Sequence, residues 1–188
     1  MTVIALIGMP GSGKSSVGRQ LARRLNWAFV DTDTEIERQI GCSIRTYFER
    51  EGEAAFRDVE QAVLVRLIDR DRAILATGGG VVLRETNREL LASHAQVVYL
   101  RSTPEELMRR LRHDTHRPLL QVGDPYRKVR EMFEQRDRLY RECARFVIET
   151  GRPSVKLLCG MILMQLELAG VVDPSESPSP LVPDRGGG

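Results

Sequence analysis

The stretch GMPGSGKSS at residues 8–16 holds residue types suited to binding a polyphosphate. Its spacing matches G-x-x-x-x-G-K-[ST], with Gly8, Gly13, Lys14 and Ser15 at the fixed positions. Glycines alone would explain a tight turn, but a turn requires neither the lysine nor the hydroxyl. A polyphosphate site requires bare backbone N–H groups, a mobile ammonium and an oxygen ligand for Mg²⁺. The stretch is therefore interpreted as a phosphate loop.

Two carboxylates follow the next apolar run of the chain, at Asp31 and Asp33. Ligands of an open α/β sheet bind outside the carboxyl ends of its strands, so residues in this position are candidates for a site. Alternate residues of an extended segment point the same way. One carboxylate could then approach the Mg²⁺ shell while the other faces a second substrate. The alternative is that either residue only caps the helix that follows.

Three consecutive glycines, Gly78 to Gly80, follow another apolar run. A strand exit that requires positive φ would explain one of them. Close approach of a ligand to the backbone would explain all three. The sequence leaves both explanations open.

Apolar runs alternate with helical periods along the chain, which is typical of βαβ units and a parallel sheet. Five strands are expected, at Val3–Ile7, Ala28–Asp31, Ala73–Thr77, Gln96–Leu100 and Arg145–Glu149. Helices are expected at Ser15–Leu25, over most of the stretch to Arg70, and at Thr86–Ser93, Pro104–Arg112, Pro125–Cys143 and Ser154–Ala169. The pattern predicts an α/β fold with a five-stranded parallel sheet and helices on both faces.

Two segments do not fit this alternation. The polar, proline-broken stretch HDTHRPLLQVG lies between two helix starts, and we expect residues 112–124 to form a mobile lid over the site. The composition then changes at Val171 to a segment rich in Pro, Ser and Gly. We expect residues 1–170 to form one domain and residues 171–188 to be a disordered tail.

The bulk properties exclude several classes of protein. The 188 residues are 41% hydrophobic with a net charge of +2, so nothing indicates a nucleic-acid partner. The three cysteines form no CxxC pair, which argues against a zinc site or a disulfide framework. No apolar run approaches the roughly 20 residues of a membrane span, and no signal peptide is recognisable. We expect a cytoplasmic protein that is monomeric and has no membrane partner.

Taken together in order and spacing, the motifs closely resemble those of the shikimate kinases, over about residues 3–169. The phosphate loop alone is common to many NTPases, whereas the full set of motifs is typical of far fewer families. The set consists of GMPGSGKS, VDTD, FRDVE (Phe56–Glu60), LATGGG (Leu75–Gly80), HRPLL (His116–Leu120) and RDRLYRECA (Arg136–Ala144). The resemblance implies a nucleoside monophosphate kinase-like fold. It also implies transfer of the ATP γ-phosphate to the 3-hydroxyl of shikimate, on the route to chorismate and the aromatic amino acids.

The resemblance assigns the nucleotide site to the phosphate loop and to three arginines. ATP and Mg²⁺ are the implied cofactors, with Lys14 at the β- and γ-phosphates, Ser15 on the metal and Asp31 supporting its water shell. Arg117 is placed at the phosphates from the lid. Arg110 and Arg152 resemble the residues that flank adenine. The complete set implied for ATP is Gly11, Ser12, Gly13, Lys14, Ser15, Ser16, Arg110, Arg117 and Arg152.

The resemblance also assigns the acceptor site. Arg57 and Arg136 are implied to pair with the shikimate carboxylate, and Gly79 and Gly80 to present backbone N–H groups to the substrate. Asp33 is implied to hold the reacting hydroxyl and accept its proton. This gives Lys14, Asp33 and Arg117 as the catalytic residues. Guanidinium forks suit carboxylates better than ammonium groups do, which agrees with arginine at both positions.

Three other functions are compatible with parts of the sequence. A kinase for another polyol acid, such as gluconate, would share the fold and the loop but should lack the combination VDTD, FRxxE and GGG. A switch GTPase would need an asparagine and lysine pair to read guanine, but Asn26 and Asn87 precede Trp27 and Arg88. A catalytically dead regulator would have lost some of the polar residues named above, and none is lost.

Overall fold

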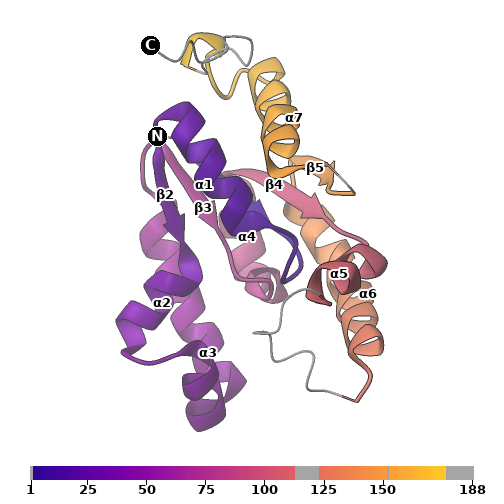
Figure 1. Ribbon diagram of the computed structural model, residues 1–188. Helices are drawn as coiled ribbons and strands as arrows, with labels where there is room; N and C mark the ends of the chain where they lie inside the picture. Colours follow the sequence, from indigo (N-terminus) through magenta and orange to yellow (C-terminus); the bar gives the residue numbers. More distant parts are fainter. Residues whose placement is uncertain (1, 113–122, 152, 177–188) are drawn as a thin grey trace, which may run out of the picture.

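The computed structural model describes residues 2–112, 123–151 and 153–176. Strands and helices alternate along the chain, as the apolar pattern predicts (Figure 1). The strands are β1 (Val3–Ile7), β2 (Ala28–Asp31), β3 (Ala73–Ala76), β4 (Gln96–Arg101) and β5 (Phe146–Glu149). The α-helices are α1 (Lys14–Leu25), α2 (Thr32–Ile40), α3 (Ile44–Ile68), α4 (Glu85–His94), α5 (Pro104–Leu111), α6 (Pro125–Cys143) and α7 (Val155–Leu168).

The five strands form one parallel sheet in the order β2-β3-β1-β4-β5, which confirms the predicted fold class. The reversal of strand order lies at β1, between β3 and β4. The carboxyl end of β1 leads directly into the phosphate loop, and those of β2 and β3 lead into Asp31 and Gly78. The candidate residues therefore meet at one edge of the sheet, at the topological switch point.

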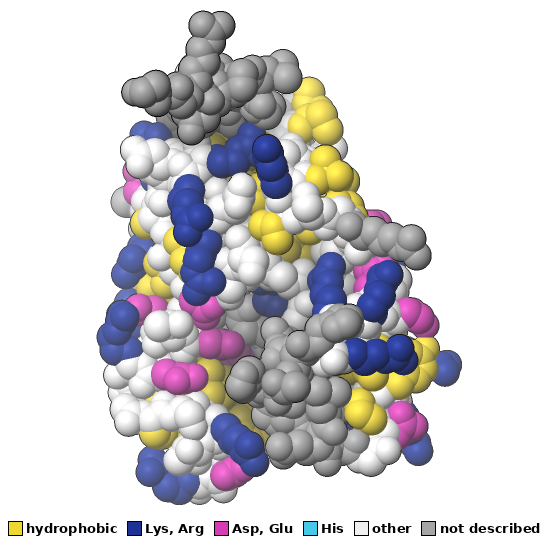
Figure 2. Space-filling view, viewed as in Figure 1, with side chains coloured by type: hydrophobic (Ala, Val, Ile, Leu, Met, Phe, Trp, Pro, Cys, Tyr) yellow, Lys and Arg dark blue, Asp and Glu magenta, His cyan; other side chains and the backbone are white. Residues whose placement is uncertain are grey.

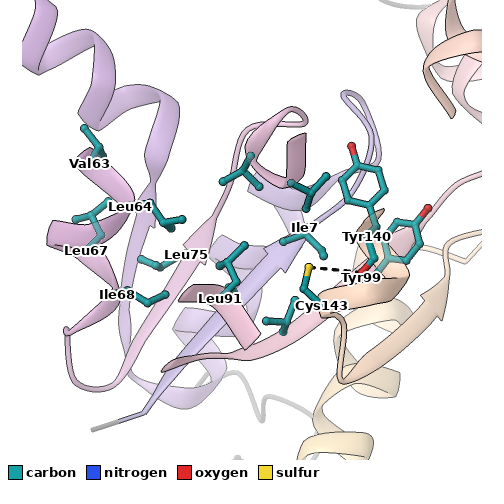
Figure 3. Packing of buried hydrophobic residues seen from close by; sticks show 14 of the residues in the cluster. Ile7, Val63, Leu64, Leu67, Ile68, Leu75, Leu91, Tyr99, Tyr140 and Cys143 are labelled. Atoms are coloured by element: carbon teal, nitrogen blue, oxygen red, sulfur yellow. Dashed lines mark hydrogen bonds between the residues drawn. The ribbon is translucent and has the colours of Figure 1, made fainter. Parts of the chain in front are cut away.

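The two faces of the sheet carry separate hydrophobic cores because successive strand residues point to opposite sides. On β1, Val3, Ala5 and Ile7 face a core built with α2 to α6, whereas Ile4 and Leu6 face α1 and α7. Figure 3 shows the first core, with α3 residues at one end and Tyr99, Tyr140 and Cys143 at the other. Both faces are thus covered, as the near-continuous apolar strands require.

Helix starts follow the expected capping chemistry. Thr103 and Glu106 form a reciprocal capping box at the start of α5, ahead of Pro104 at the first helical position. Asp124 caps α6 by accepting a hydrogen bond from the Arg127 N–H. Two features were not predicted: α3 is kinked at Gly52, where φ is 86°, and a short 3₁₀ turn forms at Val81–Leu83.

The expected start of the tail at Val171 is too early. Val172 is buried in the core against α1 and α7, and the Val171 N–H bonds to the Leu166 carbonyl. A 3₁₀ turn follows at Pro174–Glu176. The packed chain therefore extends beyond residue 170, because two valines still have apolar area to bury. Residues 177–188, the rest of the expected tail, lie outside the described residues.

Lys and Arg side chains are spread over the face seen in Figure 2 and alternate with acidic ones, so no single basic field covers it. Apolar side chains gather at the upper right of the same view, where α7 exposes Leu157, Met164 and Leu168. Within the described ranges, no helix has the length and apolar composition needed to cross a membrane.

Candidate active site

The phosphate loop is held open by glycine geometry. Gly8, Gly11 and Gly13 all have positive φ, and a Cβ on Gly8 would lie 2.5 Å from the Leu100 carbonyl oxygen. Such a position admits only glycine. The Lys14 ammonium is buried and donates to the carbonyl oxygens of Gly8 and Met9, each at 2.8 Å. The loop thus holds a positive charge at the N-terminus of α1, which favours an anion.

Ser15 and Asp31 meet beside this loop. The Ser15 hydroxyl donates to Asp31 Oδ2 at 2.6 Å, while Asp31 Oδ1 accepts the N–H groups of Asp33 and Thr34 and caps α2. The sequence left open whether Asp31 caps a helix or faces the phosphate loop, and the structure shows that it does both. A hydroxyl and one carboxylate suit Mg²⁺, which keeps waters and binds substrate phosphates. Among the described residues, no group of three or more His, Cys, Asp or Glu forms a cage for a metal.

Asp33 is half-buried at the same edge, one residue inside α2. Burial raises the pKa of its carboxyl from 3.8 to about 6, and the neighbouring charge of Asp31 adds to the rise while Lys14 opposes it. The group is therefore ionised at neutral pH and has a higher proton affinity than an exposed aspartate. Both properties suit a proton acceptor.

The glycines Gly78 to Gly80 serve close packing rather than a positive-φ turn, since none of the three has positive φ. A Cβ on Gly78 would lie 2.8 Å from Asp33 Oδ1, and one on Gly79 would lie 2.6 Å from Pro10 Cδ. A Cβ on Gly80 would overlap the Arg57 guanidinium. The three residues thus let the phosphate loop, Asp33 and Arg57 approach one backbone segment.

A cavity of about 320 Å³ lies at this edge and joins the two groups of residues. Its walls include the phosphate loop, Asp31 and Asp33, and the segment Thr77–Gly79. Ser15 and Ser16 line it, whereas the Ser12 side chain is fully buried within the loop near Lys14. Residues predicted to bind phosphate and residues predicted to bind the acceptor therefore share one space.

Arg57 and Arg136 lie beyond Gly80, on α3 and α6. The Nε atom of each is buried with no hydrogen-bond partner in the described part of the chain. Arg57 bonds to Glu60 at 2.8 Å, and both guanidinium groups lower the pKa of Glu60 against the rise that its burial causes. Arg57 also pairs with the exposed Glu53 at 3.6 Å, but the two buried Nε–H groups still leave donors for an anionic ligand.

Comparisons with known proteins agree with this geometry. The family model described as shikimate kinase matches residues 10–167. The shikimate kinase of Burkholderia pseudomallei (strain 1710b) is 53% identical over 169 residues, 90% of this chain and 92% of the relative. That of Paracidovorax citrulli (strain AAC00-1) is 55% identical over 175 residues, 92% and 96% of the two chains. The chain belongs to the shikimate kinase family.

A solved structure supports the same conclusion. The shikimate kinase from Acinetobacter baumannii in complex with shikimate superposes with a TM-score of 0.84 at 43% identity, covering 92% of this chain and 96% of that one. The chain is thus a transferase that phosphorylates the 3-hydroxyl of shikimate with ATP and Mg²⁺. These matches favour a shikimate kinase over the three alternatives, which were a gluconate kinase, a switch GTPase and a catalytically dead regulator.

Some residues implied by the shikimate kinase resemblance are not placed. Arg117, Arg152 and residues 113–122 of the expected lid lie outside the described residues. Arg110 is described, and its Nη1 donates to the Gly11 carbonyl at 3.2 Å and to the Ser102 hydroxyl at 3.3 Å. It therefore lies against the phosphate loop, and its contact with adenine remains a prediction.

Glu60 is a site residue to which the sequence analysis gave no role. It is only 3% exposed and lies at i+3 from Arg57, on the helix face that also carries Phe56 and Val63. A glutamate on an apolar helix face, three residues after an arginine, is a signal that could have identified it. Its negative charge partly neutralises the positive charges of Arg57 and Arg136 in the absence of substrate.

Proposed function

We propose that two adjoining parts of one site divide the reaction, with ATP on the phosphate loop and shikimate between Asp33 and the two buried arginines. The shared cavity carries this proposal, because its walls include both Lys14 and Asp33. Phosphoryl transfer demands mainly that donor and acceptor be aligned and that charge on the transferred group be neutralised. A single space lined from both sides meets the first demand.

At the donor end, the backbone of Gly11–Gly13 and the Lys14 ammonium hold the β- and γ-phosphates. Lys14 currently bonds to loop carbonyls, so nucleotide phosphates would replace the Gly8 and Met9 oxygens as its partners. Ser15 and Asp31 are the residues that would hold Mg²⁺, directly or through its water. The metal supplies charge neutralisation at the phosphate oxygens. The buried position of Lys14 strengthens its electrostatic effect.

At the acceptor end, Arg57 and Arg136 bind the shikimate carboxylate and Gly79 and Gly80 offer backbone N–H groups. In the described part of the chain, neither glycine N–H has an acceptor. Asp33 accepts the proton of the 3-hydroxyl as that oxygen attacks the γ-phosphorus. Its carboxylate is anionic at neutral pH, so it can orient the hydroxyl before transfer.

Further assignments rest on the resemblance and on composition. We propose that Arg117 reaches the phosphates from a lid at 112–124 and that Arg110 and Arg152 flank adenine. We also propose a cytoplasmic monomer. The free thiols of Cys143 and Cys159 are both buried, which suits a reducing compartment. Light scattering during size-exclusion chromatography tests the monomer.

The variant Asp31→Asn tests the magnesium assignment. Asparagine caps helices as well as aspartate does, so α2 should keep its start. Loss of the negative charge should raise the Mg²⁺ concentration needed for half-maximal activity by about ten-fold, in a coupled ADP-release assay with saturating ATP and shikimate. Unchanged Mg²⁺ dependence would show that Asp31 serves only as a cap.

The matched control is Asp124→Asn, which replaces another capping aspartate at the start of α6. Asp124 is the last residue of the proposed lid but lies outside the cavity walls, so this variant should keep the wild-type Mg²⁺ dependence even where kcat changes. An equal shift in both variants would point to general loss of helix order instead of a lost metal contact.

A further inference from the structure

Tyr140 is a fully buried tyrosine on α6 whose hydroxyl donates to the Gly79 carbonyl oxygen. This bond joins α6 to the glycine segment across 61 positions of the sequence. Arg136 lies one helical turn earlier on the same face, as residues four apart do. The helix that carries one of the carboxylate-binding arginines therefore also contacts the segment that offers N–H groups.

The direction of the Gly79 carbonyl fixes the direction of the next N–H group. Both belong to one planar peptide, and in a trans peptide the C=O and the N–H point to opposite sides. No peptide bond in the described ranges is cis. Holding the oxygen toward Tyr140 therefore aims the Gly80 N–H away from α6. Gly79 lines the cavity and Gly80 lies against the Arg57 guanidinium, so the Gly80 N–H lies between the cavity and Arg57.

Glycine peptides need such a restraint more than others do. Residues without a Cβ have wide backbone freedom, and a Gly79–Gly80 peptide could rotate and present its oxygen in place of its N–H. An oxygen in that position would repel the carboxylate of an acceptor and could not donate a hydrogen bond to it. A buried hydroxyl bonded to the oxygen makes the rotation costly, since both groups would lose their partner.

We propose that Tyr140 is a positioning residue for the acceptor, which it serves by orienting the Gly79–Gly80 peptide so that the Gly80 N–H faces shikimate. The inference rests on the proposed assignment of Gly80 to the acceptor site. Tyr140 touches neither substrate nor phosphate. Its contribution is to acceptor affinity, with ATP binding and the transfer step left intact.

Tyr99 supplies a matched control. Figure 3 shows its ring beside that of Tyr140. The ring centroids are 4.8 Å apart and the two residues are equally buried. Its hydroxyl donates to Asp137 at 2.7 Å, however, and Asp137 also accepts from Arg101 and Arg141. Tyr99→Phe and Tyr140→Phe thus each remove one buried hydroxyl from the same ring pair, but only the second releases the Gly79 oxygen. The Tyr140 hydroxyl also interacts with the Arg136 side chain, so the response of the Gly80 amide, in addition to KM, must distinguish loss of the peptide restraint from a displaced Arg136.

The test compares steady-state kinetics of Tyr140→Phe, Tyr99→Phe and Arg136→Ala. Tyr140→Phe should raise the KM for shikimate about five-fold, the net worth of one hydrogen bond, with kcat and the KM for ATP within about two-fold of wild type. Tyr99→Phe should leave all three within about two-fold. An unchanged shikimate KM in Tyr140→Phe, or equal increases for both substrates, would overturn the inference.

Arg136→Ala distinguishes failure of the acceptor assignment from failure of the role given to Tyr140. If it raises the shikimate KM while Tyr140→Phe does not, the acceptor assignment stands and the role of Tyr140 is wrong. If neither variant raises it, the acceptor assignment is wrong and the inference falls with it.

A second arm uses the wild-type enzyme and does not depend on any variant folding. In protein labelled with [¹⁵N]glycine, the Gly80 amide resonance should move to lower field when shikimate is added, as expected for a new hydrogen bond. In Tyr140→Phe the same change should be reduced. A Gly80 resonance that does not respond to shikimate in the wild type would contradict the proposal.

Discussion

At the scale of single residues, the burial that raises the pKa of Asp33 lowers the stability of the folded protein while it favours the proposed role as proton acceptor. Its folded pKa of about 6 exceeds the 3.8 of an ordinary aspartate, so the folded protein binds this proton more tightly than the unfolded chain does. Between about pH 4 and 6 the free energy of unfolding therefore decreases as the pH rises, and the full cost is present above pH 6. The shift corresponds to at most about 3 kcal/mol.

The variant Asp33→Asn should consequently be more stable than the wild type at pH 8, by about 1 to 3 kcal/mol, and kcat should fall by about a hundred-fold or more. The stability gain should vanish near pH 4, where both side chains are neutral. Urea unfolding at the two pH values measures the first effect and the ADP-release assay the second. Lower stability at pH 8 would mean that the carboxylate is held by contacts that outweigh its burial.

The same pKa predicts the pH dependence of the wild-type reaction. Because Asp33 must be ionised to accept a proton, kcat/KM for shikimate should fall ten-fold per pH unit below about pH 6. A pH profile of kcat/KM at constant ionic strength checks this. A flat profile from pH 7 to 5 would exclude Asp33 as the proton acceptor.

At the scale of elements, the segment after β3 lies between the phosphate loop and Arg57, one of the two arginines proposed to bind the acceptor. Gly79 packs on Pro10 of the loop, and Gly80 packs on the Arg57 guanidinium. Neither has a positive φ, so alanine is tolerated by the backbone at both positions. The two glycines therefore separate donor and acceptor effects within one short segment.

We expect Gly80→Ala to displace the Arg57 guanidinium and raise the KM for shikimate by about ten-fold or more, with little change in the KM for ATP. Gly79→Ala should instead push on Pro10 and raise the KM for ATP more than that for shikimate. Kinetics with each substrate varied in turn measure the split. The same pattern in both variants would contradict the separate contacts.

At the scale of the whole molecule, the packed chain ends later than its composition suggests. Deleting residues 174–188 should leave the melting temperature within about 2 °C of the wild type, because a composition rich in Pro, Ser and Gly predicts little apolar burial there. Deleting residues 171–188 should lower it by roughly 3 to 10 °C, since burial of a valine is worth about 1.5 to 3 kcal/mol. Differential scanning calorimetry checks both. Equal melting temperatures would show that Val172 contributes nothing to stability.

The elements of this fold could be predicted from the sequence because each carries a local signal. The Pro125–Cys143 helix begins at a proline after a capping aspartate and was predicted with the same bounds. The kink at Gly52 and the 3₁₀ turn after Gly80 carry no comparable signal, because a single helical glycine or a three-residue turn is compatible with many sequences. Strand order also depends on packing between distant segments.

The site divides in the same way. Lys14 and Ser15 belong to a local motif, so their positions follow from spacing alone. Tyr140 acts through a glycine 61 positions away, and only the fold brings them together. Composition places Val172 in a tail because it averages over a window, which hides one buried valine and one partly buried valine.

The assignment of shikimate to the space beside Asp33 requires that Arg136 bind its carboxylate. The direct measurement is a double cycle of affinities, combining Arg136→Ala with a shikimate analogue whose carboxylate is replaced by a neutral amide.

Each change alone should cost about 2 to 5 kcal/mol of acceptor binding, and both together should cost little more than one, because they break the same contact. Arg138→Ala, an exposed arginine on the same helix, serves as the control and should leave acceptor affinity unchanged. If the losses from Arg136→Ala and from the amide add in full, Arg136 does not hold the carboxylate.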